Sequence, residues 1–317
     1  MKALDKIVLI FILLVLSVVS LHIGAMSITN IFNMSYAELR VMLDGRVPRL
    51  ITIIVSGMGM SICGLIMQGL TRNKFVSPTT AGTMDGARLG VLVSMLVMGS
   101  AGLFWRTLFA FAFTLLTTLI FIKMLEKIKY KNVIFVPLVG IMYGNILASI
   151  TMFFAYRHDL VQNVSTWLIG DFSGVLRSNY SMIYVSVPLV VLTYIYANKF
   201  VIAGMGEDFA KNLGLNYRMT MNIGLCIVSV IASIVLLTVG IIPFLGLIIP
   251  NLVSIFWGDN LRKTLPYTAI CGAIFLLICD IIGRLIIHPF EVPINLTVGV
   301  IGGAIFLWLL LRKKTHG

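Results

Sequence analysis

The sequence has few charged residues. They make up 11% of its 317 positions, whereas apolar residues make up 59%, and the mean hydropathy is +1.03. A soluble domain is typically about 25% charged and about 45–50% apolar, and no stretch of ordinary charge density is long enough to form one here. The scarcity of charge therefore excludes a soluble globule and predicts an all-α integral membrane protein, with residues 1–317 as a single transmembrane domain.

The sequence also lacks motifs for catalysis and for nucleotide binding. It has no Gly-Lys-Ser/Thr phosphate loop, no His-Glu zinc helix and no supported Ser/His/Asp arrangement. The cysteines lie in apolar runs without metal-ligand spacing, which indicates packing. They are Cys63, Cys226, Cys271 and Cys279. We therefore expect a chain that is not an enzyme and that binds no metal or cofactor of its own.

Apolar runs, some of them broken by glycine, predict about ten transmembrane helices. A helix needs about 20 apolar residues to cross the hydrocarbon core of a bilayer. The predicted spans are 5–27, 47–67, 82–102, 106–124, 134–155, 180–198, 220–240, 243–257, 266–287 and 294–311. The eighth is short and contains Pro250, so we expect a broken or tilted element there.

The charges of the loops assign a side of the membrane to each of them. The net charge is +12, and cytoplasmic loops collect lysine and arginine. With the N-terminus placed in the cytoplasm, every lysine falls on the cytoplasmic side. Both termini are therefore predicted to be cytoplasmic. Because the basic residues are dispersed as topology signals, we expect contact with the lipid bilayer and no binding of nucleic acid.

One cytoplasmic loop predicts a short helix with its own start and end signals. Glu207 and Asp208 lie where a helix N-terminus favours negative charge. Gly214 suits a left-handed C-terminal cap, and Phe209 and Leu213, four residues apart, share a face. Two interpretations stay open from this loop alone. One is an interfacial helix or ordered turn, and the other is a docking point for a cytosolic protein.

Charged residues on the outer side form two further candidate groups. Arg46 and Arg49 flank Pro48 at the outer mouth of the second span. Guanidinium groups bind carboxylates bidentately, which suits an acidic partner; anchoring to lipid headgroups is the alternative. In the ninth span, Asp280 and Arg284 lie at i,i+4. Charges inside a bundle are a functional hypothesis, and a buried structural ion pair is the other interpretation.

Two segments suggest cavities or kinks within the membrane. Pro243, Gly246 and Pro250 interrupt the apolar run 240–251, and irregular backbone at membrane depth is tolerated only against protein or a water-filled path. This pattern indicates either a transport path or a packed kink. Trp167 begins a segment in the long outer loop that reads Trp-Leu-Ile-Gly-Asp-Phe. It suits an interfacial anchor or the mouth of a cavity.

Taken in order, these segments resemble the FecCD family, the membrane permeases of bacterial ATP-driven importers for iron–siderophores, haem and cobalamin. The resemblance covers nearly the whole chain. Its motifs are Arg46-Val47-Pro48-Arg49; Gln68 with Arg72-Asn73-Lys74 and Pro78; Trp167 with Gly170; Gly206-Glu207 with Ala210 and Leu213-Gly214; the run from Phe244 to Pro250; Gly258-Asp259 with Arg262 and Leu265-Pro266; Asp280 with Arg284; and Glu291 with Pro293. The chain departs from the family after Pro250, where Asn251 and Leu252-Val253-Ser254-Ile255 replace the usual His and Arg.

The resemblance implies the permease fold of a type II ABC importer in the bacterial cytoplasmic membrane. It implies two cytosolic ATPase subunits, which bind the ATP and Mg and dock on the coupling loop at about 199–219. It also implies a second permease subunit, either a copy or a related chain, and an extracytoplasmic siderophore-binding protein. The coupling residues would be Gly206, Glu207, Asp208, Ala210, Leu213 and Gly214. The binding protein would meet Arg46, Arg49 and Arg284. The translocation path would include Gln68, Trp167, Pro243, Gly246, Pro250 and Asp280.

The segment from Arg72 to Asp85 looks most like permeases for catecholate siderophores such as petrobactin. The expected function is therefore translocation of a ferric siderophore by alternating access. Two alternatives remain. One is an ABC permease for haem or cobalamin. The other is a secondary transporter driven by an ion gradient, which would use Asp280, Arg284 and the kinked eighth span.

Overall fold

The computed structural model describes residues 2–24, 36–99, 102–127, 135–175, 181–287 and 289–312. All regular secondary structure in this part of the chain is helical. The helices are α1 (Lys2–His22), α2 (Tyr36–Val41), a π-helical turn (Met42–Arg46), α3 (Val47–Thr71), α4 (Thr83–Met98), α5 (Leu103–Lys127), α6 (Phe135–Arg157), α7 (Val161–Leu168), a 3₁₀ turn (Ser181–Val185), α8 (Ser186–Met205), α9 (Glu207–Asn212), α10 (Tyr217–Thr238), α11 (Leu245–Trp257), α12 (Leu261–Leu285) and α13 (Ile294–Arg312).

Each of the ten predicted spans corresponds to a helix, but two of these helices are short. Eight helical segments in the described residues are long and apolar enough to cross a membrane. The third predicted span, 82–102, is α4 with 16 residues, and the eighth is α11 with 13 residues. About 20 residues are needed for a full crossing, so these two helices depend on their neighbours for burial. The eighth span was expected to be short, whereas α4 is shorter than the predicted 82–102.

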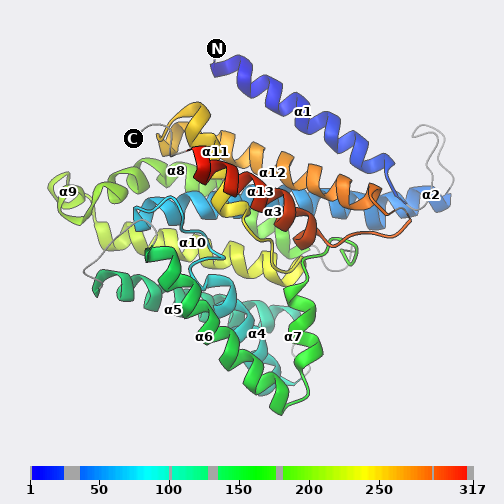
Figure 1. Ribbon diagram of the computed structural model, residues 1–317, viewed down its shortest axis with the longest axis horizontal. Coiled ribbons are helices and arrows are strands. Elements are labelled where there is room, and N and C mark those ends of the chain that lie inside the picture. Colours follow the sequence, from blue (N-terminus) through cyan, green and yellow to red (C-terminus); the bar gives the residue numbers. More distant parts are fainter. Residues whose placement is uncertain are drawn as a thin grey trace.

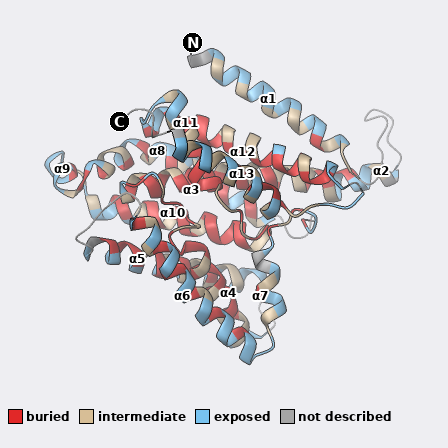
Figure 2. Cartoon of the chain, in the orientation of Figure 1, coloured by how far each residue is buried: buried red, intermediate tan, exposed pale blue. Residues whose placement is uncertain are grey.

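The chain is arranged as a bundle around α3. α1 begins and α13 ends toward the same end of the molecule as α9, whereas α2 and α7 lie toward the other end (Figure 1). This arrangement agrees with the expected placement of both termini on one side. The buried residues gather on α3, α10 and α12, while α1 is largely exposed (Figure 2). An apolar helix with so little protein contact is suited to face lipid.

The central helix α3 crosses α11 at a close contact between glycines. A Cβ added at Gly64 would lie only 1.7 Å from the carbonyl oxygen of Gly246. Small residues allow helix backbones to approach in this way, so the two helices pack through their main chains.

The same crossing resolves a backbone defect in α11. Pro250 has no N–H, so the carbonyl of Gly246, four residues earlier, lacks its usual intrahelical donor. The Gln68 side chain of α3 points its Nε2 at the carbonyl oxygens of Gly246, at 3.5 Å, and Leu247, at 3.4 Å. At this position the kink is therefore packed against protein, which is one of the two outcomes expected from the sequence.

We predict that Gly64→Ala destabilises the protein. The new methyl group would overlap the Gly246 carbonyl and force α3 away from α11, and such overpacking typically costs about 1–3 kcal/mol. The control is Gly299→Ala in α13, where an added Cβ meets nothing within 4 Å. Thermal unfolding in detergent should show a midpoint several degrees lower for Gly64→Ala than for the control. Equal midpoints for the two variants would refute the close-contact account.

Candidate functional site

The predicted cytoplasmic helix is present as α9, with the expected start and end. Glu207 and Asp208 lie in its first turn. Glu207 pairs with Lys211 at 2.8 Å, and the hydrogen bond and charge of Lys211 lower the pKa of Glu207. Gly214 has a φ of +75°, and its N–H donates to the Lys211 carbonyl at 2.9 Å. The expected left-handed cap is therefore confirmed.

The two sides of α9 differ sharply in exposure. Ala210 is fully buried, whereas Phe209 is 49% exposed and Leu213 is 59% exposed. Met205, the last residue of α8, is 57% exposed and lies just before the break at Gly206. We call Met205, Phe209 and Leu213 the docking face. Large exposed apolar side chains gathered at the cytoplasmic end of the bundle typically mark a contact surface for another protein.

The outer end of the bundle carries a chain of alternating charges. Arg49 lies 2.7 Å from Asp280 and 2.7 Å from Glu291, and Arg284 lies 2.7 Å from Asp280. The Asp280 side chain is only 2% exposed. A buried carboxylate is tolerated where it is paired and hydrogen-bonded, and the two arginines provide both for Asp280. The interpretation of Asp280 and Arg284 as a structural ion pair therefore describes the geometry.

Two of the outer arginines also hold the end of α1. Arg46 donates to the carbonyl of Leu21 at 2.7 Å. Arg284 donates to the carbonyls of Ser20 and Ile23 at 3.0 and 2.8 Å. The last carbonyls of a helix lack intrahelical donors and carry partial negative charge, so guanidinium groups stabilise this end. The three arginines are thus brought together as expected, each with an internal partner, and their role in binding-protein docking stays a prediction.

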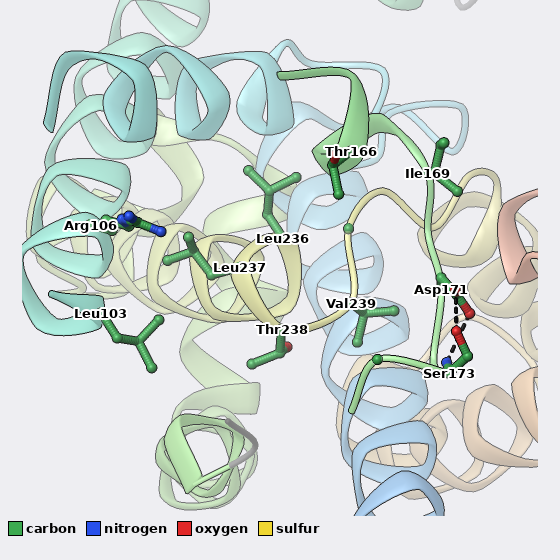
Figure 3. Close-up of a pocket in the computed structure, with 12 residues that line it drawn as sticks. Leu103, Arg106, Thr166, Ile169, Asp171, Ser173, Leu236, Leu237, Thr238 and Val239 are labelled. Carbon is green, nitrogen blue, oxygen red and sulfur yellow. Dashed lines mark hydrogen bonds between the residues drawn. The ribbon is translucent and has the colours of Figure 1, made fainter. Parts of the chain in front are cut away.

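A cavity of about 610 Å³ opens on the outer side of the bundle. It lies between the start of α5, the α7 region and the end of α10, with Arg106 and Asp171 on different walls (Figure 3). Asp171 accepts hydrogen bonds from the backbone N–H of Ser173, at 2.8 Å, and from its hydroxyl. The segment after Trp167 therefore lines a cavity, as one of its two interpretations expected. The side chain of Trp167 itself lies outside the described residues.

The residues predicted to line a path lie in three places. Gln68, Gly246 and Pro250 meet where α3 crosses α11, and Pro243 precedes α11. Asp280 belongs to the outer charge cluster, and Trp167 lies on α7 beside the outer cavity. Two residues of these sites, Met205 and Arg106, were not predicted. The position of Met205 beside the predicted start of α9 was the signal for the first, and the position of Arg106 at the outer start of a span was the signal for the second.

We predict that Arg284→Gln destabilises the outer end of the bundle. It leaves Asp280 with one cation and removes donors from the end of α1, and breaking a buried pair typically costs about 3–5 kcal/mol. The control is Arg40→Gln, because Arg40 is exposed and donates to the Tyr36 hydroxyl one turn away; its expected effect is about 0.5 kcal/mol or less. Thermal unfolding in detergent measures both variants. If Arg284→Gln unfolds at the same temperature as Arg40→Gln, the proposed anchoring of α1 is wrong.

Comparisons with known proteins agree with this geometry. The chain matches the FecCD transport family over residues 7–312. It is 55% identical to the petrobactin import system permease protein YclN of Bacillus subtilis (strain 168), over 97% of this chain and 98% of that protein. It is 44% identical to the ferric-anguibactin transport system permease protein FatD of Vibrio anguillarum, over 84% of this chain and 85% of that protein.

A solved structure supports the fold independently. The chain resembles that of a metal-chelate type ABC transporter in an inward-facing conformation, with a TM-score of 0.82 and 21% identity, covering 97% of this chain and 99% of that one. At this identity the likeness carries the fold alone, and it confirms the expected type II ABC importer permease fold. Together with the family match and the apolar helices, it establishes that this integral membrane protein belongs to the FecCD transport family.

Proposed function

We propose that this chain is the membrane-spanning permease subunit of an ATP-driven importer that moves a ferric siderophore into the cytoplasm by alternating access. The observation that carries the proposal is α9, a cytoplasmic helix whose docking face leaves Phe209 and Leu213 about half exposed. The chain has no nucleotide-binding motif, so the energy for transport must come from a partner. A cytosolic ATPase seated on the docking face supplies it.

Three kinds of partner complete this importer. Two ATPase subunits bind the ATP and Mg and contact α9. A second permease subunit, a copy or a related chain, forms the other half of the path. An extracytoplasmic protein delivers the siderophore to the outer end, where Arg49 is the more exposed of the two arginines that flank Asp280, at 15% against 5% for Arg284. We infer that Arg49 is the first of these arginines to meet acidic groups of that protein. If Arg49 exchanged its internal partners for those groups, Arg46 and Arg284 would still donate hydrogen bonds to the end of α1.

The substrate class is inferred from the relatives. The relative at 55% identity is named for petrobactin and the one at 44% for ferric anguibactin, whereas one named for vitamin B12 is 28% identical. Petrobactin is therefore the first candidate, ahead of cobalamin or haem. The rival, an ion-gradient transporter, needs a carboxylate that can exchange ions. Asp280 is held by Arg49 and Arg284, so its geometry favours a structural role.

Reconstitution in liposomes tests the proposed function. Vesicles containing this chain, its second permease and its ATPase should take up ferric petrobactin from a loaded binding protein only when ATP is present inside with the ATPase. Ferric citrate serves as the substrate control. Uptake driven by an ion gradient through this chain without the ATPase would replace the proposal with the secondary-transporter alternative.

We predict that Phe209→Ser weakens binding of the ATPase by tenfold or more. Central aromatic anchors at interfaces often contribute about 2 kcal/mol or more, and Phe209 is the middle residue of the docking face. The permease should stay folded, since the side chain is half exposed. Lys211→Gln on the same helix is the matched control, because Lys211 is exposed and lies two residues from Phe209, on another side of the helix. Affinity is measured with the permease in nanodiscs, and equal affinities for the two variants would contradict the assignment of this face.

A further inference from the structure

A side chain from the end of α3 lies directly on the backbone that begins α9. A Cβ added at Gly206 would lie 2.4 Å from Nη2 and 2.9 Å from Cζ of Arg72. The guanidinium group of Arg72 therefore occupies the space that a side chain at Gly206 would fill. Arg72 caps α3 and Gly206 caps α9, so this contact joins the central membrane helix to the cytoplasmic one.

The two residues of this contact differ in what their backbone conformations cost. Arg72 is left-handed, with φ 52° and ψ 35°, which costs a residue with a side chain roughly 1–2 kcal/mol. Such conformations persist where the surroundings hold them and are concentrated at functional and switching sites. Gly206 has φ 122° and ψ 161°, which glycine adopts at little cost and other residues almost never adopt.

On the α3 side, the contact is fixed to the membrane bundle. The N–H of Asn73 donates to the Gln68 carbonyl at 3.1 Å, which closes the end of α3 just below the α11 crossing. A Cβ added at Gly204 would lie 3.0 Å from the Gly69 carbonyl oxygen, so the ends of α3 and α8 also touch through their backbones. A displacement of α9 at Gly206 therefore meets the end of α3 first.

Beyond Arg72, the chain is tied to the cytoplasmic end of α11. Lys74 pairs with Asp259 at 2.7 Å and donates to the Ser254 hydroxyl at 2.9 Å. Asn251 donates to the Lys74 carbonyl at 2.7 Å. Partial burial alone would raise the pKa of Asp259, but hydrogen bonds from Lys74 and Ser254 and the Lys74 charge lower it. Asp259 is therefore ionised at neutral pH, and its contact with Lys74 links the end of α3 to the end of α11.

A cavity beside this junction leaves room for movement. It has a volume of about 370 Å³ and is lined by residues from the ends of α3 and α8 and from the α11–α12 connection, among them Arg72, Gly204 and Asp259. Packed elements switch between discrete arrangements rather than deforming continuously. The guanidinium group of Arg72, which extends from a left-handed residue beside this cavity, has the properties of such an element.

We propose that Arg72 is a positioning residue that transmits movement of α9 to α3 and, through Lys74 and Asp259, to α11. The proposal rests on the proposed function, because it assumes that the ATPase moves α9. The Arg72 guanidinium group lies against the Gly206 backbone. Movement of α9 and rearrangement of the α3–α11 pair therefore occur together. Arg72 makes this link through the permease itself and is not needed to hold the ATPase.

The test uses the complete complex in liposomes and separates assembly from coupling. The variants are Arg72→Ala, Arg72→Lys, Gly206→Ala and the double variant Arg72→Ala with Gly206→Ala. Arg262→Ala is the control, since Arg262 is an exposed cytoplasmic arginine for which no ion pair occurs among the described residues. Three quantities are measured: the ATPase retained on the permease, the rate of ATP hydrolysis, and the ferric petrobactin transported per ATP hydrolysed.

We expect Arg72→Ala to retain the ATPase and to hydrolyse ATP within about twofold of wild type, with transport per ATP about tenfold lower, a loss of about 1.4 kcal/mol in coupling. Arg72→Lys should restore part of the loss, because lysine keeps the charge but not the planar group. The double variant should be no worse than the poorer single variant, as two residues of one contact are not additive.

Three results would overturn the proposal. The first is transport per ATP in Arg72→Ala equal to that in Arg262→Ala, and the second is loss of the bound ATPase in Arg72→Ala. The third is a fold-loss of transport per ATP in the double variant that equals the product of the fold-losses in the two single variants. Failure of the proposed function looks different, because the wild-type chain would then neither retain the ATPase nor take up ferric petrobactin with ATP.

Discussion

The crossing of α3 and α11 at Gly64 and Gly246 is the contact on which the rest of the structure depends. Pro250 leaves the Gly246 carbonyl without its helical donor, and Gln68 reaches it from α3. Because the backbones are in contact there, neither helix can shift without the other. An interruption that would weaken an isolated helix instead fixes the central helix of the bundle to a short neighbour.

The charge cluster at the outer face and the Arg72–Gly206 contact at the cytoplasmic face both involve the ends of α3. Its 25 residues span about 37 Å, from one side of the membrane to the other. Arg46 and Arg49 at its outer end meet α1, Asp280 and Glu291. Arg72 at its inner end meets the start of α9. A single stiff helix therefore links the charge cluster of the outer face to the docking helix of the cytoplasmic face, as alternating access requires.

Much of this architecture could be predicted from sequence, for identifiable reasons. Long apolar runs located the helices, because a membrane permits few alternatives to them. The charges of Glu207 and Asp208 and the glycine at 214 defined α9, because helix ends carry local signals. The short α11 was predicted nearly at its bounds, because Pro243 and Pro250 interrupt the apolar run; α4 ends earlier than predicted, at Met98, where Gly99 has a positive φ.

Other features depend on tertiary contacts that leave no mark on the local sequence. Helical spacing separates Ala210 from Phe209 but does not tell which of them faces the bundle. Likewise, the pattern around Arg46 suited an external partner, whereas its hydrogen bonds go to the last turn of α1, a different helix. The contact between Arg72 and Gly206 could not be predicted without knowing both the positive φ of Gly206 and the path of α8.

The most direct test of the central claim is an electron cryomicroscopy structure of this chain with its ATPase, trapped with a non-hydrolysable ATP analogue. The account predicts that α9 lies against the ATPase and that Phe209 and Leu213, now 49% and 59% exposed, become buried in that contact. An ATPase bound elsewhere on the cytoplasmic side, with the docking face still open to solvent, would contradict it.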